Sequence, residues 1–325
     1  MRQRILISGG AGYVGRTLAR KLYDDHDVLV LDSLRFGAGR ISATDFGRIR
    51  LEAVDLRNTQ RVAAVVGDFA PDVIVHLAAI HYIPECEADP ATATSVNVVG
   101  TVNLLQAAPA GSRFVFASSG AVYAPEETPH REDGSPIAPS DVYGFTKLQG
   151  EQFVGHFARS RGLEAVVVRL FNVVGPGETN PHLLPEIVAQ LKAGRDVVRL
   201  GNIWPKRDYV HVEDAAEGFA AAALDGHVAP GETATVNLGT GRQYSVEEIL
   251  HRLRAAAGLD FAIEADPSRA RAVDRPFLCA DTGRMAERFG WQAKRDIDMA
   301  IADLWRAPDL SPALTAKYLP VQRVA

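Results

Sequence analysis

A tyrosine and a lysine stand four residues apart in Tyr143-Gly144-Phe145-Thr146-Lys147. On a helix, residues at this spacing share one face. A free phenol has a pKa of about 10 and is a poor base at neutral pH, but a neighbouring ammonium or other nearby positive charge stabilises its phenolate. The pair is therefore suited to exchange a proton with a substrate hydroxyl. A plain surface pair on a helix is the alternative for this motif alone.

Hydroxyl groups follow an apolar run at Phe114–Ala117, in the segment Ser118-Ser119-Gly120-Ala121-Val122-Tyr123. At the carboxyl end of a parallel strand, such a group points into the crevice where α/β sheets bind ligands. The segment therefore predicts a hydroxyl group in the ligand crevice.

A glycine-rich turn, Gly9-Gly10-Ala11-Gly12-Tyr13-Val14-Gly15, follows the first apolar run and opens a helical pattern. Glycines at this spacing permit a tight turn and let the backbone approach a pyrophosphate at the helix N-terminus. Asp32 ends the next run, 17 residues past Gly15, where a carboxylate accepts hydrogen bonds from an adenosine ribose and repels a 2′-phosphate. This favours NAD over NADP. Arg35 lies nearby and could attract a 2′-phosphate, and the alternative is that it is an exposed structural arginine.

The elements that must position these groups alternate between short β-branched runs and longer helical patterns, which is typical of parallel βαβ units. Helices are predicted to start near Gly12, Thr59, Pro90 and Asp141. We therefore expect an α/β fold with a doubly wound parallel (Rossmann) sheet. Its predicted strands are Arg4–Ser8, Val28–Asp32, Arg50–Val54, Val73–Leu77, Phe114–Ala117 and Ala165–Leu170.

Beyond residue 170 the pattern loosens, with glycine and proline at 175–177 and further helices expected at 185–193, 245–257 and 282–289. We predict a dinucleotide-binding domain over 1–170 with a return segment at 208–240. A smaller α/β lobe that binds the substrate is expected over 171–207 and 241–325.

Bulk composition excludes several classes of protein. The 325 residues are 47% hydrophobic and 23% charged with a net charge of −5, an ordinary globular balance without the basic footprint of a nucleic-acid binder. No apolar run approaches the roughly 18 residues of a membrane helix. The two cysteines provide neither a disulfide framework nor a metal cluster. We expect a cytoplasmic protein with no nucleic-acid, membrane or metal partner.

Several motifs in chain order resemble the extended short-chain dehydrogenases/reductases: the 9–15 turn, Asp32, Asp55-Leu56, His76-Leu77-Ala78-Ala79, Asn97, Ser118–Tyr123 and Tyr143/Lys147. The resemblance implies Ser119, Tyr143 and Lys147 as catalytic residues. It implies that the cofactor-binding residues are Gly9, Gly12, Tyr13, Val14, Gly15, Asp32, Ser33, Asp55, Leu56, Leu77, Ala78, Ala79, His81, Asn97, Tyr143 and Lys147.

The second half resembles the UDP-sugar 4-epimerases, through Arg169–Pro176, His182–Pro185, Arg207–Val212 and Asn237–Gly241. Guanidinium groups suit a diphosphate, although Arg207 and Asp208 pairing with each other is the alternative. The substrate-binding residues that this resemblance implies are Ser119, Gly120, Tyr143, Asn172, Thr179, Leu183, Arg207 and Arg271.

The residues that follow Ser119 help to distinguish among the reactions of related enzymes. Related dehydratases have an acidic pair after the active hydroxyl residue, and related decarboxylating enzymes have a glutamate in this loop. Here Gly120 and Ala121 follow Ser119, and neither side chain can transfer a proton. The resemblance therefore implies oxidation and re-reduction at C4 through a transient 4-keto sugar. NAD is then tightly bound and regenerated in each turnover.

Two positions bear on the ligands. His81 stands where many relatives have a lysine near the cofactor, so cofactor retention is expected to be weaker, although His81 could equally be a packing residue. Leu278, at the position that limits access of N-acetylated sugars, leaves these substrates unfavoured. Thr179 and Asn180 match the place where UDP-glucuronate 4-epimerases hold their carboxylate, which favours UDP-glucuronate over UDP-glucose and UDP-galactose.

Two other functions use parts of the same residue set. A one-way reductase of a 4-keto nucleotide sugar would share the catalytic residues but release its cofactor. A non-catalytic NAD-binding sensor would have no need for Ser119, Tyr143 and Lys147 together. The resemblance also implies a homodimer, built from the helices near 90–108 and 141–158.

Overall fold

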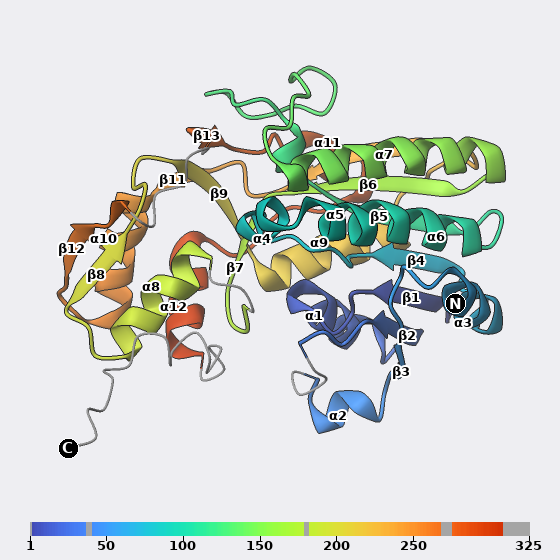
Figure 1. The fold of residues 1–325 in the computed structure, drawn as a ribbon, viewed down its shortest axis with the longest axis horizontal. Helices are drawn as coiled ribbons and strands as arrows, with labels where there is room; N and C mark the ends of the chain where they lie inside the picture. Colours follow the sequence, from blue (N-terminus) through green and yellow to red (C-terminus); the bar gives the residue numbers. More distant parts are fainter. Residues whose placement is uncertain (1, 37–40, 179–181, 268–274, 308–325) are drawn as a thin grey trace.

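The computed structural model describes residues 2–36, 41–178, 182–267 and 275–307. Seven parallel strands form its large sheet, in the order β10-β6-β5-β4-β1-β2-β3 (Figure 1). Because β1 pairs with β2 on one side and β4 on the other, the strand order reverses at β1, as in a doubly wound sheet. The predicted fold is therefore confirmed. The strands are β1 (Arg4–Ser8), β2 (Asp27–Asp32), β3 (Arg50–Ala53), β4 (Val73–His76), β5 (Arg113–Ser119), β6 (Glu164–Leu170) and β10 (Thr233–Leu238).

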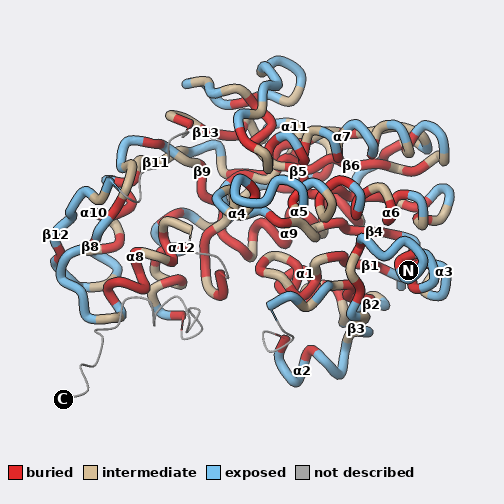
Figure 2. The backbone as a smooth tube through the Cα atoms, viewed as in Figure 1, coloured by how far each residue is buried: buried red, intermediate tan, exposed pale blue. Residues whose placement is uncertain are grey.

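Helices cover both faces of this sheet, because the side chains of each strand alternate between two apolar layers. In β1, Ile5 and Ile7 pack with helices α1 (Tyr13–Leu22) and α9 (Val212–Leu224). Leu6 faces the opposite layer, formed by α3 (Thr59–Phe69), α6 (Gly100–Ala107) and α7 (Val142–Arg161). Figure 2 shows the sheet as the buried centre of this half of the molecule.

The helix that carries the Tyr/Lys pair begins as the sequence predicted. Asp141 is the N-cap of α7, and its Oδ1 accepts a hydrogen bond of 2.7 Å from the N–H of Gly144, the arrangement that satisfies a free donor of the first turn. The helix ends at Gly162, whose φ of +67° favours glycine. Within it, Tyr143 and Lys147 lie one turn apart.

The helix predicted near Pro90 is more segmented than expected. It consists of α5 (Pro90–Thr94), a π-helical turn (Ser95–Val99) and α6, and a separate short helix, α4 (Ile83–Ala88), precedes it. Single π turns often accompany functional positions, and this one contains Asn97. A short 3-10 turn (Gly120–Val122) follows β5, and α2 (Ala43–Phe46) precedes β3.

The smaller lobe lies beyond the carboxyl ends of the large sheet, on the left of Figure 1. Apolar residues of its three helices, including Ile187, Ile249 and Ile301, form a separate core. Strands β7 (Asn172–Val174), β9 (Lys206–His211), β11 (Gln243–Ser245) and β13 (Phe277–Leu278) form one small sheet, and β8 (Val197–Leu200) pairs with β12 (Ala262–Ala265). The helices are α8 (Leu183–Lys192), α10 (Val246–Ala257) and α12 (Ile297–Arg306).

The chain passes between the two parts of the molecule more than once. Strand β10 completes the large sheet and α9 lies against it. Helix α11 (Gly283–Phe289) also packs against β10, with Met285 and Phe289 in the core of the large sheet. This corrects the assignment of the whole of 241–325 to the smaller lobe, because the apolar face of α11 has its partner on the large sheet. The other domain limits stay predictions.

Within the described ranges of the chain, none of the helices is both long and apolar enough to span a lipid bilayer.

Two helical glycines allow a test of how α7 packs. A Cβ at Gly150 would overlap the ring of Phe116 on β5, whereas a Cβ at Gly67 on α3 meets nothing within 4 Å. Overpacking a core costs about 1–3 kcal/mol, while alanine gains about 0.5–1 kcal/mol over glycine inside an open helix. We expect Gly150→Ala to lower the thermal unfolding midpoint and the matched Gly67→Ala to raise it slightly. Equal midpoints for the two variants would contradict this packing.

Candidate active site

A cleft of about 1620 Å³ opens between the carboxyl ends of the large sheet and the smaller lobe. Its wall includes the Gly9–Gly15 turn, the segment after β4 and the ends of β5 and β6. Pockets for drug-sized ligands measure about 300–1,000 Å³, so this cleft is large enough for a dinucleotide beside a second ligand.

The glycine turn forms a cradle that larger side chains would fill. Gly9 has a φ of +73°, and a Cβ there would lie 2.6 Å from the backbone nitrogen of Ala78. A Cβ at Gly15 would overlap the carbonyl oxygen of Gly9. Helix α1 begins directly after Gly12, without a side-chain cap, so that its first N–H groups can bind a phosphate. These features fit the pyrophosphate of a dinucleotide.

Asp32 lies at the end of β2, where a ribose would be recognised. One carboxylate oxygen accepts a hydrogen bond of 3.1 Å from the N–H of Ala11 and the other accepts one of 2.8 Å from that of Leu34. The carboxylate is thus held at the mouth of the glycine turn. Arg35 forms an ion pair with Glu85, with an N···O distance of 2.5 Å, so the cation that could attract a 2′-phosphate already has a carboxylate partner.

Ser119, Tyr143 and Lys147 converge in the wall of the cleft. The Oγ of Ser119 accepts a hydrogen bond of 3.1 Å from the N–H of Ala121 and lies close enough to the phenol of Tyr143 to affect its pKa. The Nζ of Lys147 donates to the carbonyl of Ala117 at 2.7 Å and lies 5.7 Å from the centroid of the Tyr143 ring. Three groups that are far apart in the sequence thus form one cluster.

Burial acts on both titratable members of this cluster. It raises the pKa of Tyr143 above its ordinary value of 10, while the hydrogen bond with Ser119 acts in the opposite sense. Burial also lowers the pKa of Lys147 to about 8, and Cys86 and Glu151 oppose that shift. Both effects disfavour charge. The phenolate therefore depends on the nearby ammonium and on any cation that a ligand brings.

The cleft walls contain most of the cofactor-binding residues that the sequence predicted. Asp55 among them pairs with Arg57 at 2.6 Å, and this hydrogen-bonded pairing holds the pKa of Asp55 below its ordinary value. The predicted residues that line the cleft are Gly9, Gly12, Tyr13, Val14, Gly15, Asp32, Ser33, Asp55, Leu56, Leu77, Ala78, Ala79, His81, Tyr143 and Lys147.

Asn97 is buried and lies outside the described wall of the cleft, so its contact with the cofactor stays a prediction. Its Oδ1 accepts a hydrogen bond of 2.8 Å from the N–H of Ile80, and its Nδ2 donates to the Ile80 carbonyl at 2.9 Å and to the Thr146 hydroxyl at 3.0 Å. Both ends of the amide therefore connect the segment after β4 to α7.

Gly120 is also buried outside the described wall of the cleft, so its contact with the substrate stays a prediction. A Cβ there would lie 3.2 Å from the Phe171 ring and 3.3 Å from Leu278. This close packing favours glycine at the position.

Three of the other predicted substrate-binding residues, Asn172, Leu183 and Arg207, line the cleft. Thr179 and Arg271 lie outside the described residues. The alternative pairing of Arg207 with Asp208 does not form, because Asp208 is fully buried and accepts hydrogen bonds from Thr240, Gly241 and Ala280. Arg207 donates instead to the carbonyls of Lys206 and Arg275, at 2.8 and 2.6 Å.

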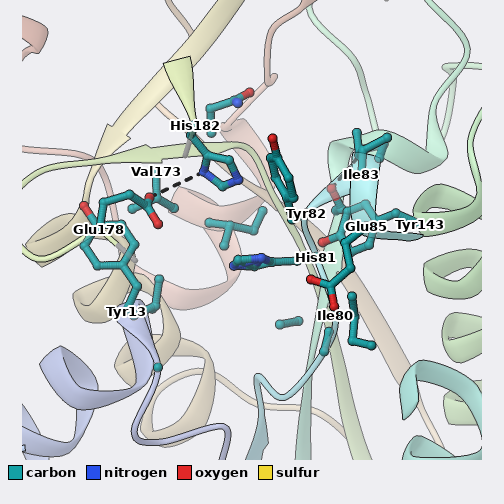
Figure 3. Close-up of a pocket in the computed structure, with 18 of the residues that line it drawn as sticks. Tyr13, Ile80, His81, Tyr82, Ile83, Glu85, Tyr143, Val173, Glu178 and His182 are labelled. Atoms are coloured by element: carbon teal, nitrogen blue, oxygen red, sulfur yellow. Dashed lines mark hydrogen bonds and ion pairs between the residues drawn. The ribbon is translucent and has the colours of Figure 1, made fainter. Parts of the chain in front are cut away.

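Sequence reasoning missed a charged cluster that crosses the cleft. His182 lies 3.5 Å from the buried carboxylate of Glu178, and its ring centroid is 5.6 Å from that of His81 (Figure 3). Desolvation by the cleft walls, followed by the charge of His182, lowers the pKa of His81. The motif His182–Pro185 pointed to this loop, but only the fold brings it to the segment after β4.

Arg275 was also missed, because it follows the predicted Arg271 in a stretch without periodicity. Its guanidinium forms a buried ion pair with Asp141 at 2.9 Å and donates to the carbonyl of Ala121 at 2.9 Å. It therefore connects the smaller lobe to the N-cap of α7 and to the loop after Ser119.

Known proteins resemble this chain in sequence and in fold. Residues 5–239 match the NAD dependent epimerase/dehydratase family. A UDP-glucose 4-epimerase of Lactobacillus helveticus is 32% identical over 324 residues, covering 93% of this chain and 96% of that protein. A UDP-glucose 4-epimerase of Brucella ovis, solved in complex with NAD, has a TM-score of 0.82 at 28% identity, with 93% and 97% of the two chains covered.

The protein MoeE5 is a further structural neighbour. Its complex with UDP-glucose and NAD has a TM-score of 0.80 at 26% identity, covering 93% of this chain and 97% of that one. Its complex with UDP-glucuronic acid and NAD has a TM-score of 0.81 at 24% identity, covering 97% and 100%, a likeness of fold alone. The expected cofactor, NAD, is confirmed by the family and by these neighbours. The chain belongs to the NAD dependent epimerase/dehydratase family.

Proposed function

We propose that this protein is an NAD-dependent 4-epimerase of UDP-hexoses. The observation that carries the proposal is the convergence of Ser119, Tyr143 and Lys147 in a cleft whose other end is a dinucleotide cradle. Relatives named UDP-glucose 4-epimerase that span nearly the whole chain support it.

Each residue of the cluster has a separate part in the chemistry. Tyr143 removes the proton of the C4 hydroxyl and later returns it, and Ser119 hydrogen-bonds the same oxygen. Lys147, fixed to the carbonyl of Ala117, stabilises the phenolate. NAD, when bound, supplies the acceptor and donor of hydride. We propose that it stays bound between turnovers, because its redox state is the same before and after an epimerisation.

The opposite side of the cleft is suited to hold the nucleotide part of the substrate. Arg207 and Asn172 come from the small sheet, and Leu183 begins α8. A guanidinium group and the N-terminus of a helix both favour a diphosphate. Leu278, which lines the same cleft, takes up room beside the sugar and disfavours an acetamido group.

Two sugars remain candidates within this class. The sequence favours UDP-glucuronate through Thr179 and Asn180, which lie outside the described residues. Relatives named UDP-glucose 4-epimerase, which span nearly the whole chain, favour UDP-glucose and UDP-galactose. We keep UDP-glucuronate as the first candidate and let the substrate assay decide between them.

We also propose a cytoplasmic, homodimeric enzyme. Both cysteines are buried free thiols, which suits a reducing compartment. On α7, Phe145 and Phe153 are 52% and 38% exposed, and Val99 of the adjacent π turn is 47% exposed. An apolar patch of this kind marks an interface, and it lies on the helices from which the sequence predicts a dimer.

The first prediction concerns turnover without added cofactor. Purified protein incubated separately with UDP-glucose, UDP-galactose and UDP-glucuronate should convert at least one of them to its C4 epimer, as measured by chromatographic separation of the products. Conversion of none would favour the one-way reductase, and a preparation free of bound dinucleotide would support the same reading.

The second prediction concerns the phenol. Tyr143→Phe removes the proton-transferring group and keeps the ring, so we expect kcat to fall by about 10²–10⁴-fold, the usual contribution of general acid–base catalysis. NAD should still be found in the purified variant. Tyr82→Phe is the matched control, because Tyr82 lines the same cleft beside His182 but lies outside the catalytic cluster. Equal rates for Tyr143→Phe and the parent would exclude the mechanism.

The third prediction concerns assembly. Phe153→Glu places a charge in the exposed apolar patch and should convert a dimer into monomers, as measured by light scattering during gel filtration. Leu259→Glu, at a residue that is 42% exposed in the smaller lobe, is the control and should leave the mass unchanged. A monomeric parent at micromolar concentration would contradict the dimer.

A further inference from the structure

A buried ion pair lies directly behind the catalytic cluster and has no part in the chemistry above. Glu151 and Arg169 have side chains that are only 10% and 7% exposed. Two parallel hydrogen bonds join them, with Nε to Oε1 at 2.9 Å and Nη2 to Oε2 at 2.8 Å. Such bidentate pairs have a fixed geometry.

The pair connects the three elements that meet at the catalytic cluster. Glu151 lies on α7, one turn after Lys147, and Arg169 is the penultimate residue of β6. The hydroxyl of Ser118, the neighbour of Ser119 on β5, donates to Oε1 of Glu151 at 2.5 Å. Lys147 already binds the carbonyl of Ala117. Two successive turns of α7 are therefore bonded to two successive residues at the end of β5.

Arg169 extends the connection across the sheet. Its Nη1 donates to the hydroxyl of Tyr123 at 2.9 Å, and that hydroxyl donates to Oδ1 of Asn237 on β10 at 2.8 Å. Asn237 in turn donates to the carbonyl of His130 at 2.7 Å. The loop that begins at Ser119 is therefore fixed at its far end, Tyr123, by the same guanidinium.

Stability alone does not account for this pair. Removing two charges from water costs several kcal/mol per ion, and well-packed apolar residues often stabilise a protein as well as a buried ion pair does. What the ion pair adds is a single relative position of α7, β5 and β6. The reaction requires such precision, because a misplacement of about 1 Å can cost about 10²-fold in rate.

We propose that Glu151 is a positioning residue of the reaction, which holds the end of β5, and with it Ser119, in register with Tyr143 and Lys147 on α7. The proposal rests on the function proposed above. Glu151 touches neither ligand nor reacting atoms; it acts through Ser118 and Arg169. Its negative charge also favours the ammonium of Lys147 and opposes the burial that lowers the pKa of this lysine.

The test compares two glutamates that form ion pairs at opposite ends of strands β5 and β6. Glu151→Gln keeps the shape of the side chain and removes its charge. Glu164→Gln is the matched control, since Glu164 pairs with Arg113 at 3.1 Å at the opposite, amino-terminal ends of β5 and β6. We expect Glu151→Gln to lower kcat by about 10–100-fold with KM within about twofold, and Glu164→Gln to leave both within about twofold. An equal decrease in kcat for Glu151→Gln and Glu164→Gln would overturn the proposal.

The pH profile separates positioning from charge. Protonated Lys147 is the active form, so the rate of the parent should fall as the pH rises through about 8, instead of through the ordinary lysine pKa of 10.5. Glu151→Gln removes a carboxylate that raises this pKa, so its alkaline limb should move to lower pH. Ser118→Ala retains the ion pair and should lower kcat without moving the limb. If the rate of Glu151→Gln fell at the same alkaline pH as the rate of the parent, the effect of the Glu151 charge on Lys147 would be contradicted.

Hydrogen–deuterium exchange of the NAD-bound protein provides a readout that needs no turnover. Peptides spanning Ser118–Val122 should exchange faster in Glu151→Gln and Ser118→Ala than in the parent and Glu164→Gln. Unchanged exchange in both variants would overturn the positioning role. A parent that epimerises no UDP-sugar would instead overturn the proposed function, and the exchange data would still decide the role of Glu151.

Discussion

The close contact of α7 with the end of β5 is the constraint on which the site depends. Glycines on the inner face of α7 permit it: a Cβ at Gly144 would lie 2.6 Å from the carbonyl oxygen of Ala121, and one at Gly150 would overlap Phe116. Between them, Lys147 is buried and reaches the carbonyl of Ala117. Close helix–strand packing therefore brings Tyr143 to Ser119, and a larger residue at either glycine would push the two apart.

The electrostatics of the cleft follow from the same burial. The end of β5 and the inner face of α7 exclude water, so charge on Tyr143 or Lys147 is unfavourable in the absence of partners. Fully bonded polar groups surround the pair, including the Glu151–Arg169 ion pair and the amide of Asn97. A preorganised, water-poor site of this kind strengthens each electrostatic interaction within it.

The interleaved path of the chain joins the two sides of the cleft. Strand β10 and helix α11 belong to the large sheet, although segments of the smaller lobe precede and follow them. Arg275 bonds to Asp141 and Ala121, and His182 faces His81. Residues of the smaller lobe thus contact both the N-cap of α7 and the segment after β4. The smaller lobe and the large sheet therefore form the wall of the cleft together.

The sequence alone determined the doubly wound sheet, because buried parallel strands are continuous apolar runs and the glycine turn and Asp32 mark the ends of the first two. It also determined the Tyr/Lys pair, since a spacing of four residues is local to a helix. It could not show that Asn97 and Gly120 are buried outside the cleft wall, because the packing between distant segments decides which residues face a cavity. The very short strands β7 and β13 have too few residues for a periodic pattern.

Only the tertiary structure decided the partners of Glu151, Arg275 and His182. Each interacts with a residue that is remote in the chain or on another element, at 2.8 Å for Glu151–Arg169 and 2.9 Å for Arg275–Asp141. A charged side chain has no sequence period that reveals its partner, because Coulomb attraction and hydrogen bonding act through space. The residue types that carry the chemistry could therefore be recognised from short sequence motifs. The contacts that position them could not, because they join residues that are far apart in the chain.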